Sequence, residues 1–187
     1  AQLTVLWPTV ARGHGDAPAL ELAARWLAQE GEGCLWRQLV PTDVGVQQVR
    51  AWQWNGRLAG YLGIAAHAGD ADLTQTLSRM DTCIEELHQT PPDSAALRDL
   101  VTQWRAKWVR HLEDPVNRAE VLAQCADGVP AGDCLYMDSL ALAAVTPADV
   151  VRVVKRWLMG PGRVVVSTVP LQELHRALDD SSPLVAP

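Results

Sequence analysis

The hydrophobic and polar positions along the first part of the chain predict strands and helices. Apolar side chains alternate over residues 2–10, which is typical of a strand, and they recur at helical spacing over "ALELAARWLAQ" and "CLWRQLV". Residues 46–54 and 58–66 are predicted to be two further strands. They are separated by Asn55-Gly56, the preferred pair for a two-residue type I′ turn, so we expect an antiparallel hairpin that turns there.

The second part of the chain is predicted to be mainly helical. Helical patterns cover "LTQTLSRMDTCIEELHQ", the range 97–112 and a segment after it, and "TPADVVRVVKRWL" adds a helix with Thr146 as N-cap and Asp149 at the third position. Residues 163–170 are a continuous apolar strand, which predicts burial on both faces. The order β-α-α-β-β-α-α-α-α-β predicts an α+β fold, in which a mixed, largely antiparallel sheet packs against a layer of helices.

Composition limits the kinds of partner that we consider. The 187 residues carry a net charge of −6 and scattered basic residues, which argues against nucleic acid as a partner. No apolar run is long enough to span a membrane. We assign residues 1–170 to one domain and 171–187 to a C-terminal tail. Because the chain opens directly in a strand-like run, we expect it to be part of a longer protein.

Motifs for catalysis are missing from the sequence. The five histidines, at positions 14, 67, 88, 111 and 175, form neither H-E-x-x-H nor H-x-x-E-H. His111-Leu112-Glu113 resembles the H-x-E of zinc deaminases but lacks the closely spaced cysteine pair of that chemistry. Glu85, Glu86 and His88 lie on one helical turn, which is typical of a solvated face. We therefore predict no catalytic and no metal-binding residue in this chain.

The predicted hairpin offers a candidate binding surface instead. A turn at Asn55-Gly56 pairs Trp54 with Arg57 and divides the side chains between two faces. One face carries Arg50, Trp52, Trp54 and Tyr61, and the other carries Val49, Ala51, Leu58, Leu62 and Ile64. The second set is the predicted core. The first set consists of residue types enriched in binding hot spots, so we expect it to contact a peptide or another domain. The alternative is that a neighbouring element of the same domain covers it.

The four cysteines leave two interpretations open. Cys125 and Cys134 flank a turn-rich loop, whereas Cys34 and Cys83 lie within predicted helices. In an oxidising compartment we therefore expect a Cys125–Cys134 disulfide. The alternative is four buried thiols that act as small hydrophobic residues.

The order of several segments resembles the pitrilysin/insulinase family of zinc metallopeptidases. These segments are a strand ending in "WPT", then "GHGDAPALELAARWL", "GCLWRQLV", "GVQQVRAW", "GYLGIAAHAG" and "LALAAVTPADVVRVVKRWL". The resemblance covers roughly residues 1–170 and is strongest for the non-catalytic, C-terminal domain of a bacterial member. It implies α+β domains arranged as a clamshell, in which a partner domain carries H-x-x-E-H and zinc.

Two positions that matter in the family differ in this chain. The helix that would carry H-x-x-E-H corresponds to "DAPALELAARWL", which has no histidine and only Glu21 within its body. Here we predict Asp16 to be an N-cap and His14 a loop residue. Val40 and Val46 stand where the family places an arginine and a tyrosine that hold the substrate backbone, so those roles are not carried over.

The resemblance implies a function without catalysis in this segment. The chain would close a substrate chamber and help to bind peptide, with no cofactor of its own, while the partner domain supplies zinc. An alternative is a structural or assembly module, like the core proteins of the respiratory complex. An independent enzyme with an unrecognised site is a third, weaker interpretation. Export to the periplasm or cell envelope is expected, with the cytoplasm left open.

Overall fold

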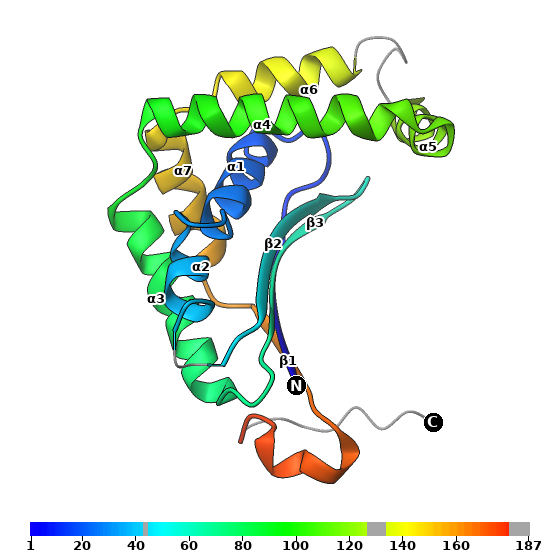
Figure 1. Cartoon of the computed structure of the whole chain (residues 1–187). Helices are drawn as coiled ribbons and strands as arrows, with labels where there is room; N and C mark the ends of the chain where they lie inside the picture. Colours follow the sequence, from blue (N-terminus) through cyan, green and yellow to red (C-terminus); the bar gives the residue numbers. More distant parts are fainter. Residues whose placement is uncertain (43–44, 127–133, 180–187) are drawn as a thin grey trace.

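A computed structural model describes residues 1–42, 45–126 and 134–179 of the chain. It has two layers, a four-stranded sheet and a set of helices that cover one face of it (Figure 1). The sheet has the order β2-β3-β1-β4 and is antiparallel at all three pairings. The strands are β1 (Gln2–Thr9), β2 (Gln48–Asn55), β3 (Gly60–His67) and β4 (Val164–Thr168). The predicted α+β architecture is therefore confirmed.

The helical layer contains one helix that the sequence pattern did not predict, α6. It lies next to α4 across the top of the molecule in Figure 1. The helices are α1 (Ala17–Leu27), α2 (Cys34–Leu39), α3 (Leu73–Gln89), α4 (Ser94–Glu113), α5 (Pro115–Ala126), α6 (Cys134–Ala143) and α7 (Pro147–Val153). A π-helical turn, η1 (Val154–Leu158), continues α7, and a 3-10 helix, η2 (Leu171–Arg176), follows β4. The predicted capping box of Thr146 and Asp149 is present at the start of α7.

The alternation along the central strand β1 sets the two faces of the sheet. Leu3, Val5 and Trp7 are almost fully buried and pack into the same core as the apolar residues of the helices. The residues between them are only partly buried. Because side chains of a strand alternate between faces, one face of the sheet is committed to the core and the other is not. In Figure 1 the helices lie on one side of the sheet only.

The hairpin forms between the predicted strands, but the predicted two-residue turn is wrong. β2 continues to Asn55 and β3 begins at Gly60, so residues 56–59 form the connection. A type I′ turn needs positive φ at both central residues, and neither Asn55 nor Gly56 has it. The end of the hairpin is instead held by the segment after β1. The Nδ2 of Asn55 donates to the carbonyl of Val10 at 2.8 Å, and the N–H of Arg12 donates to the carbonyl of Gly56 at 2.9 Å.

The observed register gives cross-strand partners that differ from the predicted ones, but the strand residues stay on their predicted faces of the sheet. Trp54 lies opposite Tyr61 rather than Arg57, a displacement of four positions along β3. Because side chains alternate with a period of two, an even displacement leaves every residue on its predicted face. Leu62 and Ile64 are fully buried as predicted. Leu58 is the exception, because it lies in the connection and is 89% exposed rather than part of the core.

A disulfide joins Cys34, the first residue of α2, to Cys83 of α3, with 5.4 Å between the Cα atoms. Both residues are buried, as small hydrophobic residues would be, but they are not thiols. Their place within helices is no obstacle, because α2 packs against α3 and the two side chains meet there. The side chains of Cys125 and Cys134 lie outside the described residues, so their pairing stays a prediction.

The last strand and the segment after it differ from the simple sequence pattern. β4 is an edge strand, and Val164 is 54% exposed, so the predicted burial on both faces is wrong. After β4, η2 is attached to the domain because Arg176 donates to the carbonyl of Gly69 and lies 3.6 Å from the carboxylate of Asp70. The division at residue 170 stays a prediction.

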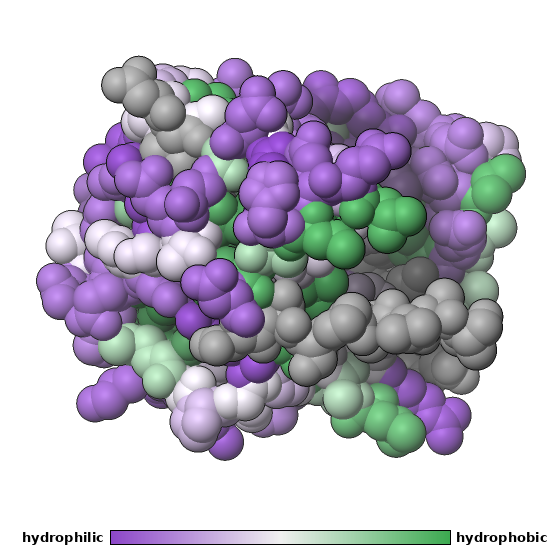
Figure 2. All heavy atoms as spheres, turned by 90° about the horizontal axis from the view of Figure 1, so that it is seen from below, coloured by the Kyte–Doolittle hydropathy of each residue, from purple (hydrophilic) through white to green (hydrophobic). Residues whose placement is uncertain are grey.

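From below, hydrophilic residues dominate the visible surface and hydrophobic residues form separate patches among them (Figure 2).

Candidate functional site

The aromatic face of the hairpin is the first candidate site. We use this name for Arg50, Trp52 and Trp54 of β2 together with Tyr61 of β3, which lie on the sheet face away from the helices. The rings of Trp54 and Tyr61 stack, with 5.3 Å between their centroids and 28° between their planes. Trp54 is nevertheless 52% exposed, so no element among the described residues covers it. The structure therefore brings these two aromatic side chains together as an accessible pair.

Trp52 extends the same surface because its neighbour across the strand pair is a glycine. It lies opposite Gly63, and a Cβ atom at position 63 would come within 2.4 Å of its ring. A larger residue at 63 would displace the indole from the sheet. The sequence alone does not indicate that Gly63 makes room for the Trp52 ring, because this depends on the observed register of the two strands. Arg50, opposite Ala65, is exposed and completes the face.

A groove of about 840 Å³ lies beside the aromatic face, along the outer edge of β2. Residues 49–52 of β2 form one wall, and the end of α1 and the side of α4 form the other walls. Arg25, Arg50 and Lys107 contribute positive charge to the lining, and Glu30 contributes the one negative charge. Arg50 and Trp52 belong to both surfaces, so the groove and the aromatic face are continuous. The groove was not predicted from the sequence, because its walls come from distant segments.

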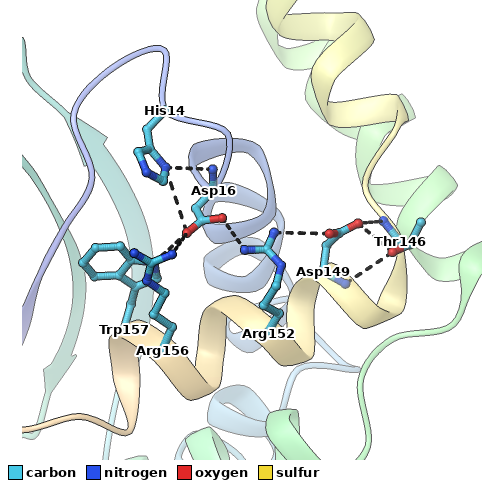
Figure 3. A network of polar contacts seen from close by, with 7 residues as sticks. All are labelled: His14, Asp16, Thr146, Asp149, Arg152, Arg156 and Trp157. Carbon is cyan, nitrogen blue, oxygen red and sulfur yellow. Dashed lines mark hydrogen bonds and ion pairs between the residues drawn. The ribbon is translucent and has the colours of Figure 1, made fainter.

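The second candidate site is the polar network around Asp16 (Figure 3). Asp16 is only 4% exposed, and its carboxylate accepts hydrogen bonds from Arg152 of α7 and from Nε1 of Trp157 at 3.0 Å. Arg156 lies 3.6 Å from the same carboxylate. His14 accepts a hydrogen bond at Nδ1 from the backbone N–H of Asp16 at 3.0 Å. These contacts join the loop before α1 to α7 and η1.

Asp16 occupies the predicted N-cap position, but the prediction that its side chain caps the helix is wrong. Asp16 stands at the N-cap of α1, but its side chain makes no capping hydrogen bond. Both of its carboxylate oxygens are instead engaged by the guanidinium of Arg152 and the indole of Trp157. His14 is a loop residue as predicted, with its side chain close to Asp16.

The electrostatics of Asp16 fit a structural role. Burial by itself would raise the pKa of the carboxyl group. Hydrogen bonds from Arg152 and Trp157, together with the positive charge of Arg152, outweigh burial and lower the pKa below its ordinary value of 3.8. An acid that is held ionised in this way, with both oxygens engaged, is unsuited to accept a proton near neutral pH. The network therefore stabilises the packing of the loop before α1 against α7 and η1, and it is not suited to proton transfer.

The residues of α1 do not fit a zinc site of the H-x-x-E-H type. The helix has no histidine, and its carboxylate Glu21 is engaged by Arg25 at 2.6 Å. Across residues 1–42, 45–126 and 134–179, no three His, Cys, Asp or Glu side chains gather in a way that would hold a metal ion. Val46 is buried and Val40 is the C-cap residue that follows α2, and both are apolar where a substrate-holding pair would be polar. No helix in the described part combines the length and apolarity that a membrane span requires.

Comparison with known proteins gives matches among solved structures alone. No family model matches the chain, and no curated protein does. The inactive peptidase domain of a Bordetella parapertussis protein classed as a zinc protease is similar with a TM-score of 0.78 and 21% identity, over 90% of each chain. A chain of complex III from Candida albicans (TM-score 0.72, 11% identity) and the periplasmic protease PqqL from Escherichia coli (TM-score 0.67, 12% identity) are also similar, each over 88% of this chain.

These likenesses establish the fold. The chain has the α+β architecture of inactive peptidase half-domains. It spans nearly all of the Bordetella domain but only 41% of the complex III chain and 18% of PqqL. In the two longer proteins, this architecture is therefore one part of a longer chain.

Proposed function

We propose that this chain is the non-catalytic half of a bacterial zinc metallopeptidase of the pitrilysin/insulinase family. It closes the substrate chamber and helps to bind peptide, while a partner domain carries H-x-x-E-H and zinc. The observation that carries the proposal is the match in fold, over nearly the full length of both chains, to an inactive peptidase domain. The order of family-like segments over residues 1–170 supports it independently.

The composition of α1 supports the assignment of hydrolysis to the partner. A catalytic zinc needs three protein ligands and an open position for water. The helix that would supply them presents apolar residues to the core instead, and Glu21 is paired with Arg25. What this half contributes is therefore enclosure and binding surface rather than chemistry. No cofactor is proposed for it.

The aromatic face supports the binding role. Trp and Tyr supply large contact area at a low cost in side-chain entropy, and Trp, Tyr and Arg are the residue types most enriched in binding hot spots. Trp54 and Tyr61 form a stacked pair that is open on the outer side. A peptide or the catalytic domain that covers this pair would bury apolar surface at little cost in reorganisation.

We propose export to the periplasm or cell envelope, and the cysteines support this location. Disulfides persist in oxidising compartments and are rare in the bacterial cytoplasm. The Cys34–Cys83 bond therefore favours an exported protein. That a neighbour in fold is a periplasmic protease agrees with this location.

A second candidate function is that of an assembly module without proteolysis. The specific observation in its favour is the likeness to a chain of respiratory complex III, at a TM-score of 0.72. In this case the partner would also lack H-x-x-E-H, and the aromatic face would hold protein subunits together rather than peptide.

Reconstitution distinguishes the two functions. The 187-residue chain is mixed with the domain encoded beside it, in the same or the neighbouring reading frame, and cleavage of a quenched fluorescent peptide is followed. We expect that domain to carry H-x-x-E-H, to cleave slowly alone, to cleave faster with the chain present and to stop when zinc is removed by a chelator. A stable complex whose partner has no H-x-x-E-H and cleaves nothing would favour the assembly module and overturn the peptidase proposal.

A further inference from the structure

We propose that the outer side of α6 is a dimerisation surface, through which two copies of this chain associate about a twofold axis. The inference goes beyond the peptidase role and does not depend on it. The aromatic face and the groove are built from β2, β3, α1 and α4, so α6 belongs to neither. The composition of α6, the exposure of its outer side and the sizes of its side chains each support the proposal.

The composition of α6 is that of a buried helix. Most of its ten residues are apolar, they show no amphipathic period, and Asp138 is the one charged residue. A helix with apolar residues on all sides is normally enclosed by other elements. α6 packs against α1 and α4, with Leu142 buried on that side, but it lies on the outside of the helical layer (Figure 1). Its outer side therefore presents apolar residues to solvent.

The exposed side of α6 carries a stripe formed by Met137, Leu140, Ala141 and Ala144. Their spacing of i, i+3, i+4 and i+7 places them on one side of a helix. Ala144 directly follows α6, and its N–H donates to the carbonyl of Leu140 at 3.1 Å, so it continues the helical turn. Met137 is 54% exposed and Leu140 is 44% exposed, so no element among the described residues encloses them. Such a stripe is suited to packing against another helix.

The side chains of this stripe are complementary in size to the same stripe in a second copy. The large residues Met137 and Leu140 come first, and the small residues Ala141 and Ala144 follow. A twofold axis between positions 140 and 141 pairs the two helices antiparallel. Met137 then faces Ala144 of the second copy, and Leu140 faces Ala141. A twofold interface must be complementary to itself, which contact with an unrelated partner does not require. This arrangement of sizes therefore favours a second copy.

Charge does not oppose the association of two copies at this place. The chain has a net charge of −6, but the stripe itself contains no charged residue. Asp138 lies on a flank of the stripe, and the positive charge of Arg12 acts on its carboxylate. Like-charge repulsion, which would otherwise separate two acidic chains, is therefore weak along the contact.

Neighbouring apolar residues extend the surface beyond α6. Nε of Arg105 in α4 donates to the hydroxyl of Ser139 at 2.8 Å, and the two helices run in opposite directions (Figure 1). Val109 therefore lies near Tyr136, and these two side chains are 63% and 64% exposed. Because a helix of ten residues is only about 15 Å long, the interface lies at the lower end of the sizes known for specific complexes. We expect a weak, reversible dimer.

Sedimentation equilibrium of the 187-residue chain tests the proposal. We expect monomers and dimers to exchange within a range of about 1–500 μM protein. Leu140→Glu should raise the dissociation constant at least about tenfold, because it places two carboxylates near the twofold axis. The matched control is Leu171→Glu on η2, which changes another exposed leucine outside the stripe and should leave the constant unchanged. Circular dichroism checks that both variants keep the helical content of the wild-type protein.

An exchange of side-chain sizes identifies the second copy as the partner. Leu140→Ala sets alanine against alanine across the axis, and Ala141→Leu sets leucine against leucine. Each single variant is expected to raise the dissociation constant at least about fivefold, through a gap or a clash. The double variant Leu140→Ala, Ala141→Leu pairs large with small again and should return to within about twofold of the wild-type constant. A partner with a different surface would not produce this recovery.

A chain that stays monomeric over the whole concentration range would overturn the proposal, as would a dimer that tolerates Leu140→Glu or a double variant that does not recover. If the chain is monomeric and Leu140→Glu instead abolishes its complex with the catalytic domain, that domain covers α6 and the second copy is refuted. The peptidase proposal is tested by cleavage, so its failure is distinguishable. A dimer that responds as expected stands whether or not the reconstituted protein cleaves peptide.

Discussion

The carboxylate of Asp16 accepts a hydrogen bond from the guanidinium of Arg152, which lies 136 positions later in the sequence. Trp157, one turn beyond Arg152, donates to the other carboxylate oxygen at 3.0 Å. The loop that leads from the central strand β1 into α1 is thereby fixed to α7 and η1, the last helical segment before β4. One buried side chain holds together the beginning and the end of the helical layer.

Replacing Asp16 by Asn is expected to lower the free energy of unfolding by about 1–3 kcal/mol, because a buried acceptor of charge-assisted hydrogen bonds loses its charge. The half-exposed Arg152 can turn to solvent, which keeps the loss below that of a fully buried pair. The matched control is Glu21→Gln, which removes a partly exposed pair with Arg25 and is expected to cost about 0–0.5 kcal/mol. Urea denaturation of both variants measures the difference, and equal losses would contradict a special role for Asp16.

The same residue predicts how stability depends on pH. The folded pKa of Asp16 lies below the unfolded value of 3.8, so between the two values the unfolded chain binds more protons and stability rises with pH. The contribution is complete above the unfolded pKa and is lost as pH falls through the folded pKa. Asp149, whose pKa is lowered by its hydrogen bond with Thr146, adds a contribution of the same sign.

Thermal denaturation between about pH 2 and pH 6 tests this dependence. We expect the wild-type protein to lose more stability on acidification than Asp16→Asn, which retains only the contribution of Asp149 and other carboxylates. Parallel curves for the two proteins would show that the carboxylate of Asp16 titrates alike in the folded and unfolded states.

Removal of the disulfide by Cys34→Ser and Cys83→Ser is expected to destabilise the domain by about 3–4 kcal/mol, since the bond closes a long loop. The two cysteines are 49 positions apart, and the bond fixes α2 to α3. Unfolding of the wild-type protein with and without a reductant should show a loss of similar size. An unchanged midpoint in both experiments would mean that the thiols are not bonded in solution.

Mass spectrometry of non-reduced peptides tests the second cysteine pair. In an exported protein we expect a Cys125–Cys134 linkage besides Cys34–Cys83. The short loop between Cys125 and Cys134 predicts a smaller stabilisation of about 2–3 kcal/mol. Free thiols at 125 and 134 alongside an intact Cys34–Cys83 bond would refute the pairing predicted from the sequence.

Replacing Trp52 and Trp54 by Ala is expected to weaken association with the catalytic half, or peptide cleavage by the reassembled protein, by about 1–3 kcal/mol per anchor. The isolated domain should lose comparatively little stability, because Trp54 is half exposed. Leu62→Ala is the contrasting variant. It removes a fully buried side chain and should cost about 2–5 kcal/mol of stability. If the tryptophan variant unfolds the domain and Leu62→Ala does not, the two faces are assigned backwards.

The hairpin shows why faces can be predicted more easily than register. Alternation within β2 and β3 fixes which side chains are buried, and Leu62 and Ile64 are in the core as expected. Register depends on the turn, and the preference of Asn-Gly for a tight turn is a local effect. Contacts of Asn55 and Gly56 with Val10 and Arg12 outweigh it. Those contacts come from a segment about 45 residues earlier, which no local pattern contains.

The features that the sequence did not predict share a dependence on distant partners. Asp16 carries every local mark of an N-cap, and its actual role appears only when Arg152 and Trp157 are folded next to it. Cys34 and Cys83 lie in separate helices whose contact face depends on packing. The groove along β2 is likewise enclosed by α1 and α4. Helix α6 has a different, local reason: most of its ten residues are apolar, and they show no amphipathic period from which a helix could be predicted.

The position of β1 in the sheet also determines when the sheet can be completed. Among the strands of this domain β1 is synthesised first and β4 last, yet the two strands pair, and Gln2 lies opposite Thr168. At a synthesis rate of about 5–20 residues per second, roughly ten to thirty seconds separate the emergence of these two partners. During that interval the edge of β1 that receives β4 is open, and an open apolar edge is a site of mispairing between chains. Folding of this domain is therefore a late event in its synthesis, and the central strand acquires its second neighbour last.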